Sequence, residues 1–282
     1  MRIDRSLALS LLMAAGCARV VVIDAQAPPL VPGLENIRSV AVGQFAATDG
    51  TPPHLAGTAA AMLAVEIQTG KRYDLSPTAD AAQLLVSGEV DCRIAEGTVE
   101  RQSEQINVWT AEVAVTFTGT AGKAMKLFTI TESPTMGDKR ALAGKVPGSA
   151  DGLAQALLWP CVRSFVEDIS PRRVRVKLPT PGIFGPRHTR RGIASLETDP
   201  GRAISELTMA VERDPDDAAA LNALGCCSEL AGNLELALSS YIYAAAIDPR
   251  DEYRENMERA HDLLARKKRI AGVAGQAKGG SE

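Results

Sequence analysis

The stretch that decides the fold is "DDAAALNALGCCSELAGNLELALSSYIYAAAIDP", which runs from Asp216 to Pro249. It predicts two antiparallel α-helices. The small residues Gly225 and Ala237 let these helices approach closely, and Pro249 ends the second because a proline cannot continue the backbone hydrogen bonding. The positions that carry the pattern are Leu221, Leu224, Gly225, Gly232, Ala237, Tyr241, Ala244 and Pro249.

The same pattern recurs 34 residues earlier, in "DPGRAISELTMAVERDP". There Ala203, Ala210 and Pro215 match the second half of a preceding repeat, whose first helix is degenerate. A further amphipathic helix is expected over 253–269, where it would cap a stack of repeats with a polar outer face. These observations predict an all-helical domain at 187–269, followed by a disordered tail at 270–282.

In these residues the chain resembles the tetratricopeptide repeat family, which has a repeat of 34 residues. One position departs from the family pattern, because Ser228 stands where an aromatic residue usually precedes the turn. The resemblance implies that the domain binds other proteins in the groove of its helical stack. It implies no chemistry.

Residues 36–178 show a different pattern, in which strands alternate with two helices. Period-two alternation predicts strands at 83–95 and 107–119, with the polar segment 96–106 as the loop between them. Shorter strands are expected at 37–45, 71–77, 126–133 and 172–178, and amphipathic helices at 55–70 and 150–170. With both helices on one face of a mostly antiparallel sheet, this order predicts a two-layer α/β sandwich, and the whole chain is of the α+β class.

The segments "IRSVAVGQF" (37–45), "KRYDL" (71–75) and "ADAAQLLVSGEV" (79–90) resemble the family of the curli secretion channel CsgG and the penicillin-binding-protein activator LpoB. The resemblance covers about half of the chain. The channel member builds a pore from long amphipathic hairpins. Because the segments 96–106 and 132–147 are expected to be short loops, we expect no such pore here.

The N-terminus has the layout of a secretory signal, with two arginines, a short apolar run and small residues before Cys17. "AAGC" (14–17) resembles the lipobox of bacterial lipoproteins. The resemblance implies that 1–16 is a signal peptide and that Cys17 is acylated and anchors the protein in the outer membrane, on the periplasmic side. Residues 17–35 are expected to form the anchor and a flexible tether. Ordinary signal peptidase would instead release a soluble periplasmic protein.

Candidate chemical sites are few. The histidines are scattered, no metal or catalytic motif occurs, and the net charge of -3 argues against nucleic acid as a partner. We expect no cofactor, no metal, no small-molecule substrate and no enzymatic activity. Cys92 and Cys161 lie on facing apolar surfaces of a strand and a helix, and a disulfide between them is one hypothesis. A basic linker is expected at 179–186.

The expected function is that of an outer-membrane-anchored periplasmic lipoprotein that acts as a protein–protein interaction scaffold in envelope assembly or secretion. Its partners would be other proteins, held in the repeat groove, and the membrane, reached through the lipid anchor. One alternative is a subunit of an oligomeric CsgG-type export channel. Another is a soluble periplasmic adaptor built from tetratricopeptide repeats.

Overall fold

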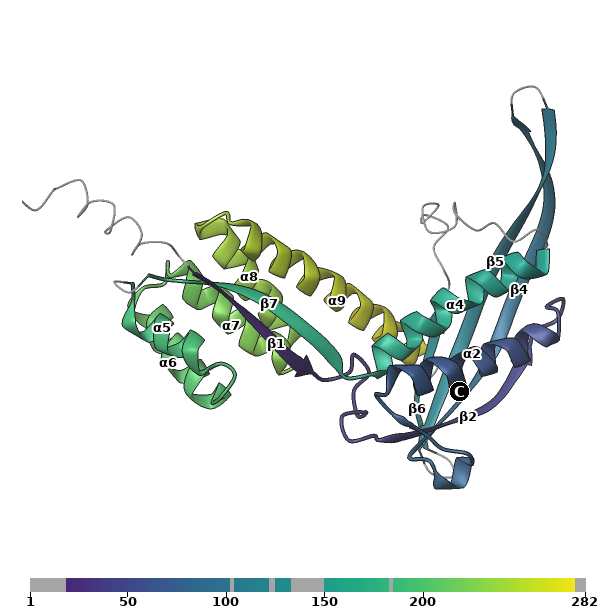
Figure 1. Ribbon diagram of the computed structural model, residues 1–282, viewed down its shortest axis with the longest axis horizontal. Helices are drawn as coiled ribbons and strands as arrows, with labels where there is room; N and C mark the ends of the chain where they lie inside the picture. The colour runs from purple at the N-terminus through teal and green to yellow at the C-terminus, as the bar shows by residue number, and fades with distance from the viewer. Residues whose placement is uncertain (1–18, 102–103, 122–124, 133–149, 183–184, 277–282) are drawn as a thin grey trace, which may run out of the picture. The chain divides into compact units, whose positions relative to one another are not determined.

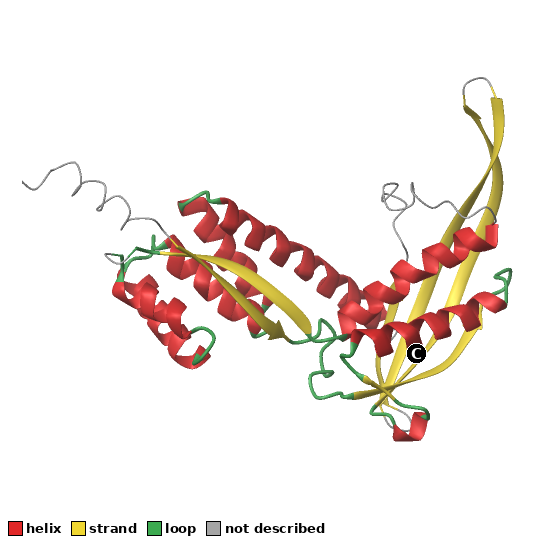
Figure 2. Cartoon of the chain, in the orientation of Figure 1, coloured by secondary structure: helices red, strands yellow, loops and turns green. Residues whose placement is uncertain are grey.

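The computed structural model describes residues 19–101, 104–121, 125–132, 150–182 and 185–276. The chain divides into two units, and neither is continuous in sequence. Unit 1 comprises Met1–Pro28 and Arg172–Lys267, and unit 2 comprises Pro29–Pro171 and Lys268–Glu282. Unit 2 is therefore inserted between two segments of unit 1. The mixture of helices and a mixed sheet confirms the α+β class at a coarse level (Figure 2).

Unit 2 contains a five-stranded sheet. Its first strand in sequence, β2, is parallel to both of the strands beside it. The remaining two pairings are antiparallel. The sheet is thus mixed, and the prediction of a mostly antiparallel sheet is wrong in this respect. Its spatial order is β3 (Asp74–Leu75), β2 (Ser39–Ala47), β4 (Leu84–Arg101), β5 (Glu104–Ala121) and β6 (Met125–Glu132).

Two helices cover one face of this sheet, α2 (His54–Gly70) and α4 (Ala150–Ile169) (Figure 1). Helix α2 buries one residue per turn, because its apolar residues recur every four positions. At the centre of the unit the rings of Phe117 on β5 and Phe165 on α4 stack with centroids 4.0 Å apart. The Tyr73 hydroxyl donates a hydrogen bond to the carbonyl of Ile169, which joins the end of α2 to the end of α4.

Strands β4 and β5 form one long antiparallel ladder. Their pairing continues from Leu85 opposite Thr120 to Arg101 opposite Glu104. The prediction of a loop over 96–106 is therefore wrong, since most of that segment continues the hairpin. The other predicted loop, 132–147, lies outside the described residues, apart from Glu132 at the end of β6.

Unit 1 begins with β1 (Arg19–Ala27), which pairs antiparallel with β7 (Arg172–Thr180) over its full length. The prediction of a flexible tether over 17–35 is therefore wrong for the described residues. The valine-rich segment 20–23 finds a strand partner far along the chain, and the Asp24 carboxylate accepts two hydrogen bonds of 2.7 Å from Arg173. Beyond β1, Leu30, Val31 and Leu34 are buried in unit 2.

The remainder of unit 1 is a series of helices that follows β7 (Figure 1). Because β7 pairs with β1, the first predicted domain ends too late: its boundary at 178 moves to 171, and the predicted linker 179–186 begins inside β7. The helices are α5 (Arg187–Ser195), α6 (Pro200–Arg213), α7 (Ala218–Leu230), α8 (Leu234–Ile247) and α9 (Asp251–Gln276), of which the part up to Lys267 belongs to unit 1. Helix α9 continues to Gln276, so the prediction of a disordered tail from 270 is wrong as far as 276.

Candidate functional site

The helices of unit 1 repeat their boundary contacts at an interval of 34 residues. Asp199 caps the start of α6 by accepting a hydrogen bond from the Arg202 N–H at 3.0 Å. Asn233 caps the start of α8 in the same way, accepting from the Leu236 N–H at 3.2 Å. The residues that end the two helices, Asp214 and Asp248, also stand at equivalent positions. The helix starts are therefore fixed by short polar side chains at repeated positions, and the helices end at the same interval through the backbone N–H groups of Asp214 and Asp248.

Each helical hairpin is closed by a glycine packed against a large residue. A Cβ atom at Gly225 would lie 2.6 Å from the ring of Tyr241, and one at Gly192 would lie 2.5 Å from Leu207. Real Cβ atoms essentially never come so close, so the approach of α7 to α8 and of α5 to α6 requires glycine. Leu207 and Tyr241 are themselves 34 residues apart.

The predicted signature residues lie where two packed helices need them. The small residues and the tyrosine are buried, namely Ala203, Ala210, Gly225, Ala237, Tyr241 and Ala244. Leu221 and Leu224 are half-buried and pack against the core clusters of the helices. Gly232 has a φ of 79° in the turn between α7 and α8. Pro215 and Pro249 directly follow the helix ends at Asp214 and Asp248.

A buried polar network joins α7, α8 and α9, and the sequence patterns did not predict it. Glu229 is fully buried on α7, where Arg259 of α9 donates to both of its carboxylate oxygens at 3.0 and 2.8 Å. The Tyr241 hydroxyl of α8 also donates to Glu229 at 2.9 Å. Burial and the adjacent Glu229 raise the pKa of Tyr241 well above its usual value. Glu229 stands next to the C-terminal end of α7, where a charged residue is ordinarily solvated, so its sequence position gives no signal of this network.

Two asparagines extend the network to the sheet of unit 1. Asn256 donates to the Oδ1 of Asn222 at 3.0 Å and to the carbonyl of Lys177 on β7 at 3.1 Å. The side-chain Oδ1 of Asn256 accepts a hydrogen bond from Arg259 at 2.9 Å. These contacts fix α9 against both α7 and β7.

The helical hairpin of α5 and α6 contains a separate polar pair. The His188 imidazole on α5 lies 2.7 Å from a carboxylate oxygen of Glu206 on α6, and both side chains are mostly buried. The hydrogen bond from His188 lowers the pKa of Glu206. Thr189, next to this histidine, donates a hydrogen bond to Asp217, which caps α7. Polar contacts therefore tie α5 to both following helices.

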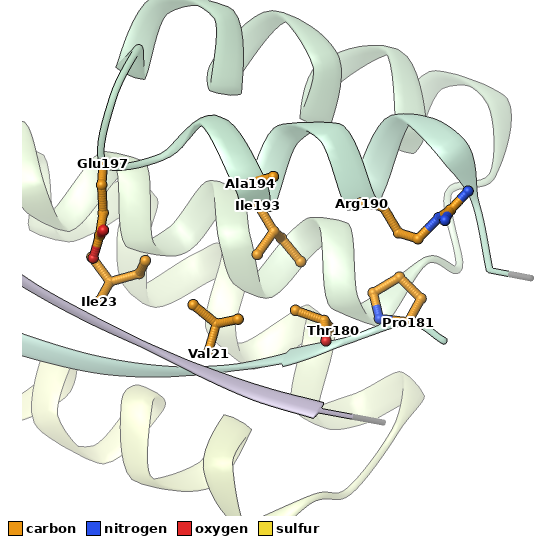
Figure 3. Close-up of a pocket in the computed structure, with 8 residues that line it drawn as sticks. All are labelled: Val21, Ile23, Thr180, Pro181, Arg190, Ile193, Ala194 and Glu197. Carbon is orange, nitrogen blue, oxygen red and sulfur yellow. The ribbon is translucent and has the colours of Figure 1, made fainter. Parts of the chain in front are cut away.

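A pocket of about 280 Å³ opens between the two-stranded sheet and α5 (Figure 3). The strands provide one wall and the helix the other, with apolar side chains in the centre. Arg190 and Glu197 lie at opposite ends (Figure 3). The lining residues are Val21, Ile23, Thr180, Pro181, Arg190, Ile193, Ala194 and Glu197.

The predicted cysteine chemistry is not found in the described chain. Cys92 and Cys161 are both buried and free, so the hypothesis of a disulfide between them is wrong in this structure. Burial raises the pKa of the Cys161 thiol to about 12. Cys226 and Cys227 are also buried and free. Cys17, the predicted lipidation site, lies outside the described residues.

Within the ranges that the structure describes, no group of three or more His, Cys, Asp or Glu side chains could hold a metal ion. Over the same ranges, none of the helices combines the length and the apolar character that crossing a bilayer would require.

Comparison with known proteins gives no family. No family model matches the chain, and no curated protein matches it. Among solved structures, a point-substituted PelC dodecamer from Paraburkholderia phytofirmans is 17% identical, with 55% of this chain and 99% of that chain covered and a TM-score of 0.30. A PelC dodecamer from the same organism in another crystal form is 18% identical, covering 53% and 98% of the two chains with a TM-score of 0.31. Likeness at this level assigns no function to the chain.

Proposed function

We propose that this protein is a lipid-anchored scaffold of the bacterial envelope that docks partner proteins through tetratricopeptide repeats. The observation that carries the proposal is the repeat of structural roles at 34 residues in unit 1. Equivalent caps, equivalent small residues and equivalent close approaches recur from α5–α6 to α7–α8. Helix α9 then takes the place of a first helix in a third repeat and caps the stack.

Stacked helical hairpins support a binding role, because each pair leaves part of its surface to a neighbour or a partner. In this proposal, unit 1 acts through the packing and shape of its helices. In this proposal, unit 2 is a CsgG/LpoB-like domain. Acylated Cys17 holds the protein at the periplasmic face of the outer membrane, and β1 joins the anchor directly to the helical unit.

The test is site-specific photocrosslinking in the native envelope. A photoreactive residue is placed at exposed positions of α6 and α8, Ile204 and Tyr243, and at the exposed Val65 of α2 as a control in the other unit. We expect specific proteins, identified by mass spectrometry, to be captured from the helical positions and to rebind as purified proteins. Absence of saturable rebinding from these positions would refute the docking role.

The location has a separate test. The intact mass of the mature N-terminus should show acyl chains on Cys17. An unmodified Cys17 would instead favour the soluble periplasmic adaptor, and would leave the docking role of unit 1 unaffected.

One feature favours a second candidate function, that of a subunit in an oligomeric export channel. Among the described residues the hairpin of β4 and β5 continues beyond its neighbours, because the pairing with β2 ends at Val90 and the described pairing with β6 ends at Val115. Long hairpins are what the channel member of the resembled family uses to build its pore. A detergent-solubilised particle of defined high stoichiometry with channel conductance would support this function, and a monomer would exclude it.

A further inference from the structure

Strand β1 presents an unprotected edge. Among the described residues the sheet of unit 1 contains only β1 and β7, so one backbone edge of β1 has no strand partner. Its valines are exposed, with Val20 at 45%, Val21 at 36% and Val22 at 39%. An exposed apolar edge of this kind is a template for pairing with another chain.

The two strands differ in how they are protected. Strand β7, "RRVRVKLPT", contains four basic residues and a proline, which are the residues that proteins use to prevent pairing at an edge. Strand β1, "RVVVIDAQA", contains neither lysine nor proline. The asymmetry indicates that the edge of β1, and not that of β7, receives another strand.

The pocket of unit 1 adjoins the same strand, since Val21 and Ile23 of β1 line it. At about 280 Å³ it lies just below the range of cofactor and drug-sized sites, which begins at about 300 Å³. Its apolar centre and small volume suit one large apolar side chain better than a whole small-molecule ligand.

The charges of the pocket specify what should surround that side chain. The Nε of Arg190 is buried without a hydrogen-bond partner, which is a costly arrangement unless an acceptor arrives. Glu197 lies at the other end (Figure 3). Arg190 lies on α5, and Glu197 lies in the turn after the helix ends at Ser195. At the helical rise, seven residues span roughly 10 Å, close to the ~13 Å between residues i and i+4 of a strand. An extended segment can therefore meet both charges from one face.

We propose that an extended segment of a partner protein pairs with the open edge of β1 and inserts an apolar side chain into the pocket. An acidic residue of that segment, two positions away, binds Arg190, and a basic residue on the other side faces Glu197. Strand addition supplies affinity through main-chain hydrogen bonds, and the pocket supplies specificity through alternate side chains. The proposal rests on the proposed docking function and names the type of segment that is docked.

The probes are two fluorescent peptides. One is acetyl-Thr-Asp-Thr-Leu-Thr-Lys-Thr-amide, and the other is its charge-reversed counterpart, in which Lys and Asp are exchanged. Both place the three recognition residues on one face of a strand. We expect one of the two charge orders to bind the intact protein at least tenfold more tightly than the other, because the direction of the added strand is fixed. A peptide with Ser in place of Leu should bind no better than the weaker order. Equal binding of all three peptides, or binding of none, overturns the proposal.

Two substitutions in the pocket test its role. Ala194→Trp fills the pocket from an exposed position, and Arg190→Gln removes the cation; each should weaken binding of the preferred peptide at least tenfold. The matched controls are Ala246→Trp on α8 and Arg187→Gln on α5, both at exposed positions outside the pocket. The controls should bind as the wild type does, and equal losses in the controls overturn the proposal.

Backbone amide hydrogen exchange provides the readout for strand addition. Amides of β1 should become protected when the preferred peptide is bound, while protection confined to other elements overturns the strand-addition mode. Failure here is distinguishable from failure of the docking function. If Ala194→Trp leaves the photocrosslinked partners unchanged, the scaffold role stands and the pocket is not its site.

Discussion

The side chains of Asn222 and Asn256 hydrogen-bond to each other at 3.0 Å, and the two residues stand 34 positions apart in the chain. They occupy equivalent places in two successive first helices, α7 and α9, so a repeated residue makes contact with its own counterpart. Asn256 also binds the Lys177 carbonyl and the Arg259 guanidinium. One amide thus holds α9 against both α7 and β7.

Asn256→Ala should therefore destabilise unit 1 by about 1–3 kcal/mol, because it leaves several buried polar groups without partners. Urea unfolding followed by circular dichroism measures the change. Glu258→Ala, at an exposed position two residues further along α9, is the control and should change stability by less than about 0.5 kcal/mol. Equal effects in both variants would show that the asparagine contact contributes nothing.

Arg259→Met should cost more than the double substitution Arg259→Met with Glu229→Gln. Removal of the arginine alone leaves the Glu229 charge fully buried and unpaired, an effect of about 3–5 kcal/mol. Neutralising Glu229 as well removes that penalty. A double-mutant cycle in urea measures the coupling. Additive effects of the two substitutions would contradict the paired arrangement.

Gly225→Ala should destabilise the α7–α8 hairpin, although alanine is the better helix former. The added Cβ would lie 2.6 Å from the Tyr241 ring, and overpacking of this kind costs about 1–3 kcal/mol. Gly201→Ala in α6 is the matched control, since its Cβ would make only an ordinary contact of 3.6 Å. The control should be neutral or slightly stabilised, and the difference in melting temperature between the two variants is the measurement.

The His188–Glu206 pair makes stability depend on pH. Because its hydrogen bond with His188 lowers the pKa of Glu206 below the ordinary 4.5, the pair stabilises the fold above pH 4.5. This contribution is lost as the pH falls below 4.5 and through the folded-state pKa. Urea midpoints measured from pH 6 to pH 3.5 should fall less steeply for Glu206→Gln than for the wild type. Glu212→Gln, at an exposed position on the same helix, should keep the wild-type slope.

The described thiols should be unreactive in the folded protein. Cys92, Cys161, Cys226 and Cys227 are buried, and burial raises the pKa of Cys227 to about 11. A thiol reagent at pH 8 should label them slowly in buffer and completely in denaturant. Electrophoretic mobility should be the same with and without reductant, and a mobility shift would restore the hypothesis of a disulfide.

Local periodicity was sufficient to predict most of the secondary structure. The four-residue recurrence of Leu55, Ala59, Leu63 and Ile67 predicted α2, and all four are buried. Small residues at fixed spacing in 216–249 predicted a helical hairpin, which α7 and α8 confirm. Each of these signals depends on neighbours along the chain, which is why a single sequence carries it.

The features that were missed depend on distant partners. The sequence around Val22 predicts a tether and not a strand, because its partner strand, opposite Val22 at Lys177, lies beyond the whole of unit 2. The same strand β7 was assigned to the wrong domain for that reason. Glu229 and Asn256 look like ordinary solvent-facing helix residues until α9 is placed against α7. Burial of such residues is a property of the tertiary packing.

The pairing of Ala27 with Arg172 imposes an order on biosynthesis. A chain that emerges from its N-terminus exposes β1 at the outset, yet the complementary strand is not made until every residue of unit 2 has followed. Closing so long a loop is slow, and an apolar strand without its partner is prone to aggregation. Unit 2 can therefore fold around its own helices first, while the sheet of unit 1 forms only once β7 has been made.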